Sequence, residues 1–170
     1  MPNWVTNVIT VDGGSDDIIG FINRHINDKG YFDFNTIIPE PKYKVETSSR
    51  YILSKEERRK SLLSDDEWFD WYHWRIRYWG CKWNAQHSDK LCFDLDRIAY
   101  EDIQSIKIVF DTPWTAPLPV AKRLTSKYKD KLRILWEWYS FESDIAGYIT
   151  RDDYGDGEIP GYYFKEYHLR

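Results

Sequence analysis

The segment at residues 132–142 constrains the fold more than any other feature of this chain, because apolar residues recur in it with a period of two. One of its faces carries Leu132, Ile134, Trp136 and Trp138. The other face carries Arg133, Leu135, Glu137, Tyr139 and Phe141. A strand that is largely apolar on both faces is typical of the interior of a sheet. The segment is therefore predicted to be a long strand at the centre of a sheet.

The rest of the chain is interpreted in the same way, from hydrophobic period and from turn residues. The other predicted strands are at residues 3–11, 32–38 and 105–112. One helix is predicted from Ser15 to the Lys29-Gly30 stop, and further helices at 55–63, 64–79 and 119–128. A terminal hairpin is predicted from strands at 146–151 and 159–167 around an acidic turn at 152–157. Their order is two strand–helix–strand halves with a helical insertion between them, followed by the hairpin. This order predicts a ferredoxin-like α+β fold, with an antiparallel sheet and helices on one face.

Length and composition favour one ordinary globular domain. The 170 residues suit a single domain at 1–170, in which residues 42–91 form a helical and loop insertion. The net charge of −4 has the wrong sign for a typical duplex binder, so duplex DNA is not an expected partner. No apolar run has the length of a membrane span, and Cys81 and Cys92 lack metal-type spacing. These features predict a cytoplasmic protein with free thiols.

Aromatic residues are the unusual part of the composition, at 18% with nine tryptophans. Five of those tryptophans lie in residues 68–84, WFDWYHWRIRYWGCKWN. If this segment is wound as a helix, Arg75 falls in the middle of a face formed by Trp68, Trp71, Tyr72 and Trp79. A guanidinium among indoles must be stacked, paired or bound, because an unpaired charge there is costly. The helix and the turn after Gly80 are therefore the first candidate site.

The candidate ligand-binding residues combine cations, an amide and indole rings: Arg75, Trp79, Lys82, Trp83, Asn84 and Trp114. Indole faces can stack a base or a sugar, while Arg75, Lys82 and Asn84 can hold a phosphate or an amide edge. Trp114 lies in the proline-rich turn FDTPWTAPLP, which could form one wall of such a site. The alternative is that the indoles pack the insertion onto the sheet and that Arg75 pairs with an acidic strand residue such as Glu137. The two interpretations are compatible.

No motif in the chain indicates catalysis, a metal or a cofactor. The nucleophile-elbow, phosphate-loop, dinucleotide and zinc-protease patterns are absent, and Asp70, His73 and Glu142 are isolated acid–base candidates. The acidic residues at 152–158 do not follow the EF-hand spacing, and the four histidines form no close pair. We therefore expect no cofactor and no metal, and an enzyme is not favoured.

Four motifs, MPNWVTN, FDFNTIIPEP, WYHWRIRYWGCKWNA and FDTPWTAPLP, occur in an order that resembles the YubB-like family. Its members are uncharacterised proteins carried by plasmids, phages and other mobile elements of bacteria. The resemblance covers nearly the whole chain, and it implies a ferredoxin-like domain in a bacterial mobile-element setting. It brings no established activity. The family usually has threonine where this chain has Cys81, which argues against a catalytic cysteine.

Together these features predict a small non-enzymatic accessory protein of a mobile element that works by binding. Its expected action is inhibition of a host defence system, either by docking on a defence protein or by sequestering a small nucleotide signal. Two other functions remain open. One is a module that binds single-stranded nucleic acid through exposed aromatics. The other is a nucleotide-processing enzyme that holds phosphate with Arg75 and Lys82.

Overall fold

The computed structural model describes residues 2–41, 71–86, 90–152 and 154–158. Its five strands form one sheet in the order β2-β1-β3-β4-β5, and every neighbouring pair is antiparallel. The strands are β1 Trp4–Asp12, β2 Ser105–Pro113, β3 Arg133–Ser140, β4 Ile145–Ile149 and β5 Tyr154–Glu158. The helices are α1 Ser15–His25, the 3-10 helix η1 Phe34–Thr36, α3 Trp71–Tyr78, α4 Leu95–Tyr100 and α5 Leu118–Lys127.

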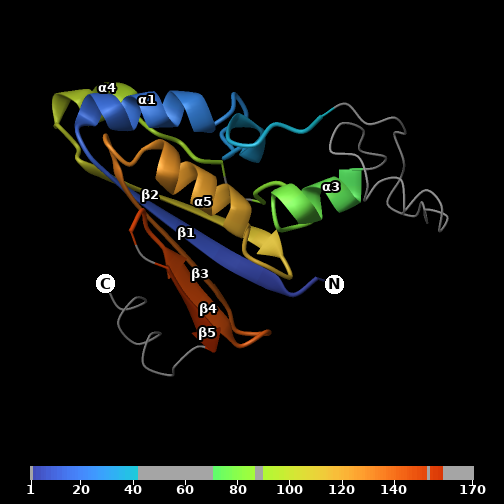
Figure 1. The fold of residues 1–170 in the computed structure, drawn as a ribbon. Coiled ribbons are helices and arrows are strands. Elements are labelled where there is room, and N and C mark those ends of the chain that lie inside the picture. The colour runs from blue at the N-terminus through green and yellow to red at the C-terminus, as the bar shows by residue number, and fades with distance from the viewer. Residues whose placement is uncertain (1, 42–70, 87–89, 153, 159–170) are drawn as a thin grey trace, which may run out of the picture.

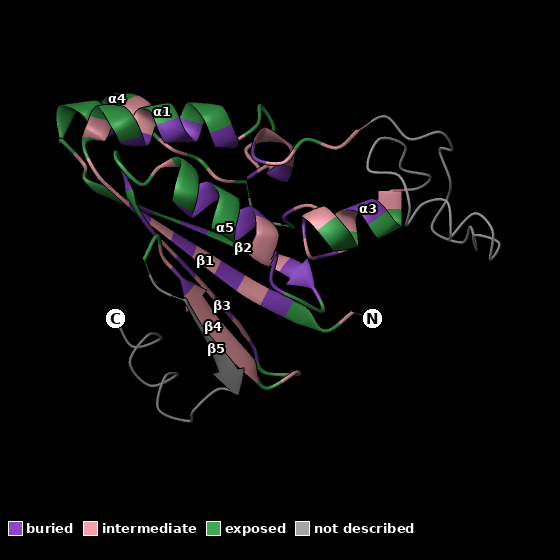
Figure 2. Ribbon diagram, in the orientation of Figure 1, coloured by how far each residue is buried: buried purple, intermediate pink, exposed green. Residues whose placement is uncertain are grey.

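The sheet has one covered face and one open face. Helices α1 and α5 lie on the same side of it, and α3 lies beyond the end where β1 begins (Figure 1). On β1, alternate residues are buried against the helices, so Val5, Ile9 and Val11 are fully buried. The residues that alternate with this buried row, Thr6, Val8 and Thr10, are only partly buried, as the alternating colours in Figure 2 show. This arrangement confirms the predicted ferredoxin-like α+β class.

Strand β1 lies in the interior of the sheet although it comes first in the sequence. It pairs with β2 on one side and with β3 on the other, so that Ile9 lies opposite both Ile108 and Trp136. The connection β2–α5–β3 therefore joins two parallel strands with β1 inserted between them. Strand β3 lies between β1 and β4, which confirms the interior position predicted for residues 132–142.

The strand predicted at residues 32–38 is wrong. This segment forms η1 and has only an isolated bridge between Phe32 and Ile26. Asp33 caps the turn by accepting a hydrogen bond from the Asn35 amide, and the Thr36 hydroxyl donates to the Asp33 carbonyl. Such local side-chain bonds offer the backbone an alternative to a strand ladder.

Three other elements differ from the prediction. The hairpin is formed by β4 and β5, so residues 154–158 form a strand instead of the predicted turn. Helix α4 was not predicted, although Asp94 accepts the Arg97 amide as a recognisable N-cap. Helix α1 begins after Gly14 without a side-chain cap and ends at His25, before the predicted Lys29-Gly30 stop.

The helix predicted at 55–63, the start of the aromatic helix and the strand at 159–167 lie outside the described residues. The single domain with an insertion at 42–91 therefore stays a prediction.

A neutral histidine is built into the helical layer. His25 is fully buried, and its Nδ1 and Nε2 contact the hydroxyls of Thr36 at 2.6 Å and Tyr128 at 2.8 Å. Because the Thr36 hydroxyl donates to Asp33, it accepts from His25 Nδ1–H, and Nε2 accepts from Tyr128. Burial, with smaller effects from Lys127 and Arg24, lowers the pKa of His25 to about 3.

The low pKa of His25 makes the stability of the protein depend on pH. The unfolded chain takes up the proton near pH 6.5 and the folded protein only near pH 3, so the contribution of His25 is complete above pH 6.5 and is lost as pH falls towards 3. The slope in this window is at most about 1.4 kcal/mol per pH unit. Urea unfolding of H25Q should show a smaller loss between pH 6.5 and 4 than the wild type. H73Q, at the exposed His73 of α3, should follow the wild type. Parallel curves for H25Q and wild type would refute this assignment.

Candidate functional site

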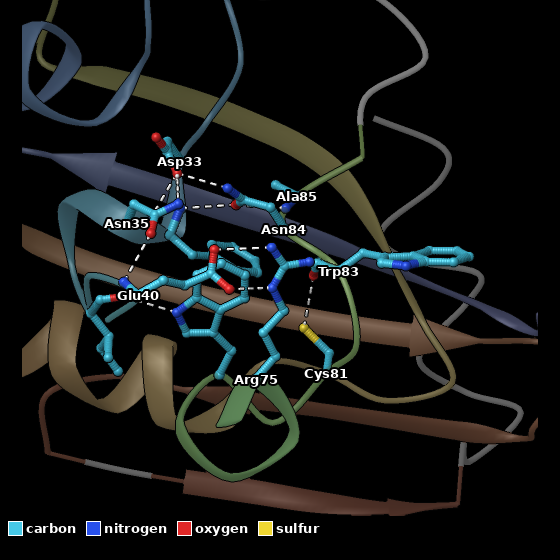
Figure 3. A network of polar contacts seen from close by, with 11 residues as sticks. Asp33, Asn35, Glu40, Arg75, Cys81, Trp83, Asn84 and Ala85 are labelled. Atoms are coloured by element: carbon cyan, nitrogen blue, oxygen red, sulfur yellow. Dashed lines mark hydrogen bonds and ion pairs between the residues drawn. The ribbon is translucent and has the colours of Figure 1, made fainter. Parts of the chain in front are cut away.

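The charge of the Arg75 guanidinium is paired with a carboxylate inside the fold. Its Nε and Nη2 donate to the two carboxylate oxygens of Glu40, the second at 2.9 Å (Figure 3). Its guanidinium carbon lies 5.0 Å from the Trp71 ring centre and 4.9 Å from that of Trp79. Both charged side chains are mostly buried, at 24% and 18% exposure. The sequence offered Glu137 as a possible acidic partner, and the structure supplies Glu40 instead.

Trp79 and Asn84 have structural partners as well. Trp79 is fully buried, and its indole N–H donates to the Ile38 carbonyl at 2.9 Å. The Asn84 side chain accepts from the Phe34 amide and donates to Asp33. These contacts fasten residues 33–40 to α3 and to the loop that follows it (Figure 3). Three of the six predicted ligand residues, Arg75, Trp79 and Asn84, therefore make their polar contacts within the chain.

The turn after α3 directs the next side chains outward. Gly80 has a φ of +82°, and a Cβ at this position would lie 2.8 Å from Pro119 Cδ, so glycine is required to end the helix here. Cys81 is buried, its thiol donates to the Trp83 carbonyl, and burial raises its pKa to about 12. It is not a nucleophile in this setting. The Trp83 indole extends away from the polar network (Figure 3).

Three indoles from distant parts of the sequence meet at the surface. Trp83 lies between Trp4 and Trp114, with ring centres 6.1 Å apart on each side and interplanar angles of 41°. Trp4 and Trp114 are 39% and 46% exposed, and Trp83 is partly buried. We call Trp4, Trp83 and Trp114 the indole surface. It is assembled from the start of β1, the loop after α3 and the loop after β2.

Lys82 adds a positive charge to the indole surface. Its ammonium lies 5.0 Å from the Trp83 ring centre, 5.6 Å from that of Trp114 and 5.9 Å from that of Tyr72. Within the described part of the chain, Lys82 forms no salt bridge or hydrogen bond. Aromatic faces attract a cation, but they leave its hydrogen-bond donors unused. The ammonium can therefore accept an anionic ligand.

The indole N–H groups separate surface tryptophans from core tryptophans. Trp79 donates to the Ile38 carbonyl, and Trp136 donates to Asn7 Oδ1 at 3.1 Å. Among the residues that the structure places, Trp4, Trp83 and Trp114 have no hydrogen-bond partner for this group. Three indole donors are thus unused in the indole surface, and two of the rings, Trp83 and Trp114, lie beside the Lys82 ammonium.

Trp114 occupies a strained backbone conformation. Its φ is +63°, and the Thr115 amide donates to the Pro113 carbonyl across it at 2.8 Å. A three-residue turn with a positive central φ is the rare and strained form of the γ-turn, and a large aromatic residue there is a genuine outlier. Such strain persists where surrounding contacts enforce it, and it concentrates at functional sites.

Several hydrogen bonds enforce this turn. The Trp114 amide donates to the Asn3 carbonyl at 2.8 Å. The Thr115 hydroxyl donates to the Gly80 carbonyl, and the Thr112 hydroxyl donates to the Thr115 carbonyl. The turn is thereby fixed to the start of β1 and to the end of α3. The same contacts bring the three indoles together.

The strain leads to a stability prediction. W114G should unfold with a free energy about 1 kcal/mol higher than that of W114A, because both lose the same ring while only alanine keeps the left-handed penalty. Urea denaturation of the two variants measures this difference. The matched pair V109G and V109A, at exposed Val109 inside β2, should show the opposite order. Equal stability of W114G and W114A would contradict the strain.

Sequence reasoning found Lys82, Trp83 and Trp114 but missed Trp4 and Tyr72 as members of this site. Period two did place Trp4 on the face of β1 opposite Val5, so the exposure of its ring was foreseeable. The rings beside Trp4 could not be predicted from this pattern, because Trp83 lies 79 positions further along the chain. Among the described residues, no cluster of His, Cys, Asp or Glu is suited to a metal ion.

A family profile described as the ferredoxin-like domain in Api92-like protein matches residues 78–168, which is more than half of the chain. The chain belongs to this family. The match includes Lys82, Trp83 and Trp114 but not β1, although β1 lies between β2 and β3 in the sheet. Residues 4–12 therefore complete the matched domain and contribute Trp4 to its surface.

No curated protein and no solved structure gives a significant match. No described helix is both long and apolar enough to cross a membrane.

Proposed function

We propose that this protein is a non-enzymatic accessory protein of a bacterial mobile element, and that it acts by binding through the indole surface. The mobile-element setting is taken from the YubB-like resemblance of the four motifs. The observation that supports binding is the convergence of three indoles with unused donors, two of which lie beside Lys82. Tryptophan is the residue type most enriched at energetic hot spots of interfaces.

The proposed action is interference with host defence, by docking on a defence protein or by sequestering a nucleotide signal. The strained turn at Trp114 favours a functional surface, since a positive φ lowers the stability of the fold and exposes this ring without improving the packing of the core. The other predicted residues have a different role. Arg75 and Asn84 are committed to Glu40 and Asp33, so they hold the surface in place instead of contacting the ligand.

The experiment compares capture of host components by three immobilised proteins. Wild type and Y100A should retain the same component from a bacterial lysate, while W83A/W114A should lose it. Tyr100 is the control because it is an aromatic residue of α4 with 93% exposure. Phage plating on a host with an active defence system should follow the same order. Equal capture and equal plating for all three proteins would refute the proposal.

A single-stranded nucleic acid is the second candidate partner, and one observation favours it. Trp4 lies on the open face of the sheet, and Tyr139 and Phe141 form a ring pair 5.8 Å apart near the same end. Tyr139 lies opposite Thr6, two residues after Trp4. Aromatic groups along such a face can stack successive bases. A gel shift at low salt with micromolar protein tests this candidate, and the absence of a shift removes it.

A further inference from the structure

We propose that the indole surface binds a nucleotide unit, with the base stacked on an exposed indole face and the phosphate on the Lys82 ammonium. This inference rests on the proposed function and names the chemistry of its ligand. Free nucleotides and nucleotides within a single strand share this chemistry. Titrations with free nucleotides and with a short single strand distinguish these two sources.

The charge around Lys82 favours a phosphate-bearing ligand. The protein has a net charge of −4, yet Lys82 stands beside three aromatic rings with no carboxylate partner among the described residues. A ligand that both neutralises this ammonium and covers the neighbouring rings carries its negative charge next to a flat group, because the ring centres lie 5.0 to 5.9 Å from the ammonium. A phosphate attached to a nucleoside meets this condition.

The spacing of the rings determines where a base can stack. A base held between two rings needs about 7 Å between the ring centres, twice the usual 3.5 Å carbon contact distance. The spacing of 6.1 Å on both sides of Trp83 is too small for this. The base must therefore stack on an outer face, and Trp114 is the most exposed residue of the indole surface, at 46%. Its centre lies 5.6 Å from Lys82 Nζ, so base and phosphate can be held at the same time.

The hydrogen-bonding groups of the indole surface also favour a nucleotide. The three indole N–H groups and the ammonium are all donors, and the indole rings carry no acceptor. Such a surface selects a ligand rich in acceptors, as phosphate oxygens, ribose oxygens and base carbonyls are. An acidic peptide would satisfy Lys82 but would leave the outer face of Trp114 without a flat partner. Duplex DNA is excluded because its bases are stacked inside the helix.

The experiment is isothermal titration of the full chain with a 5′-nucleoside monophosphate, the parent nucleoside and inorganic phosphate. The nucleotide should bind at least tenfold more tightly than either part. K82M should weaken the nucleotide at least tenfold and leave the nucleoside unchanged, whereas W114G should weaken both. K107M is the matched control, since Lys107 is exposed on β2 at the other end of the strand. Thermal unfolding of each variant verifies that it is folded.

Further titrations with a cyclic dinucleotide and a short single strand identify the source of the unit. Tighter binding of the strand than of the free nucleotides assigns the unit to a single strand, and no gain assigns it to a free nucleotide. Binding that is equal for wild type and K82M overturns the inference. Lack of any nucleotide binding, with a host component still captured through Trp83 and Trp114, also overturns it but leaves the proposed function intact. If neither binding nor capture occurs, both proposals fail.

Discussion

E40A should lower the free energy of unfolding by about 2–3 kcal/mol, because it leaves the Arg75 guanidinium largely buried without its carboxylate. The Arg75 side chain is only 24% exposed, and it is held between Trp71 and Trp79. Water can reach part of the group, so the loss lies below that of a fully buried pair. Urea denaturation at neutral pH measures the change.

The double variant E40A/R75M separates the ion pair from the packing around it. Methionine keeps an unbranched apolar chain between the two indoles, so E40A/R75M should be more stable than the sum of the single losses predicts, by about 1–2 kcal/mol. The control is the exposed pair of Arg97 and Glu101 on α4, where E101A should cost less than about 0.5 kcal/mol. If E40A is as mild as E101A, the pair does not stabilise the fold.

The prediction from sequence succeeded where the pattern depends on neighbours in the chain. The period of two located β1, β2 and β3, and the double-sided apolar pattern of residues 132–142 identified an interior strand. It failed at residues 32–38, where the local bonds of Asp33 act together with a hydrogen bond that Asn84 accepts from the Phe34 amide, 50 positions away. A local pattern contains no information about such a partner.

The candidate site shows the same limit. A helical projection correctly placed Arg75 among indoles, but it could not show whether a ligand or Glu40 satisfies the charge. Likewise, Trp79 and Trp83 are four positions apart and have opposite roles, one buried in the core and one at the surface. The difference arises at Gly80, whose positive φ ends the helix and redirects the chain. Residue type identified the chemistry, and the turn decided which residues present it.

N7L should destabilise the protein by about 3 kcal/mol, because it removes the centre of a buried hydrogen-bond network. Asn7 is fully buried on the helix side of β1, its Nδ2 donates to Thr112 at 2.9 Å, and its Oδ1 accepts from the Trp136 indole. Leucine has a similar size but would leave the Trp136 N–H without an acceptor. T10V, on the open face of the same strand, should change stability by less than about 0.5 kcal/mol.

The network also connects the core to the indole surface, so N7L should weaken ligand binding as well as stability. Thr112 accepts from Asn7 and donates to the Thr115 carbonyl, and this second bond holds the strained turn that presents Trp114. Once Asn7 is lost, Thr112 can rotate away and the turn can relax towards an unstrained φ. Titration of N7L at a temperature where it is fully folded should therefore show weaker binding than T10V. Wild-type affinity in folded N7L would show that the turn is held without the core.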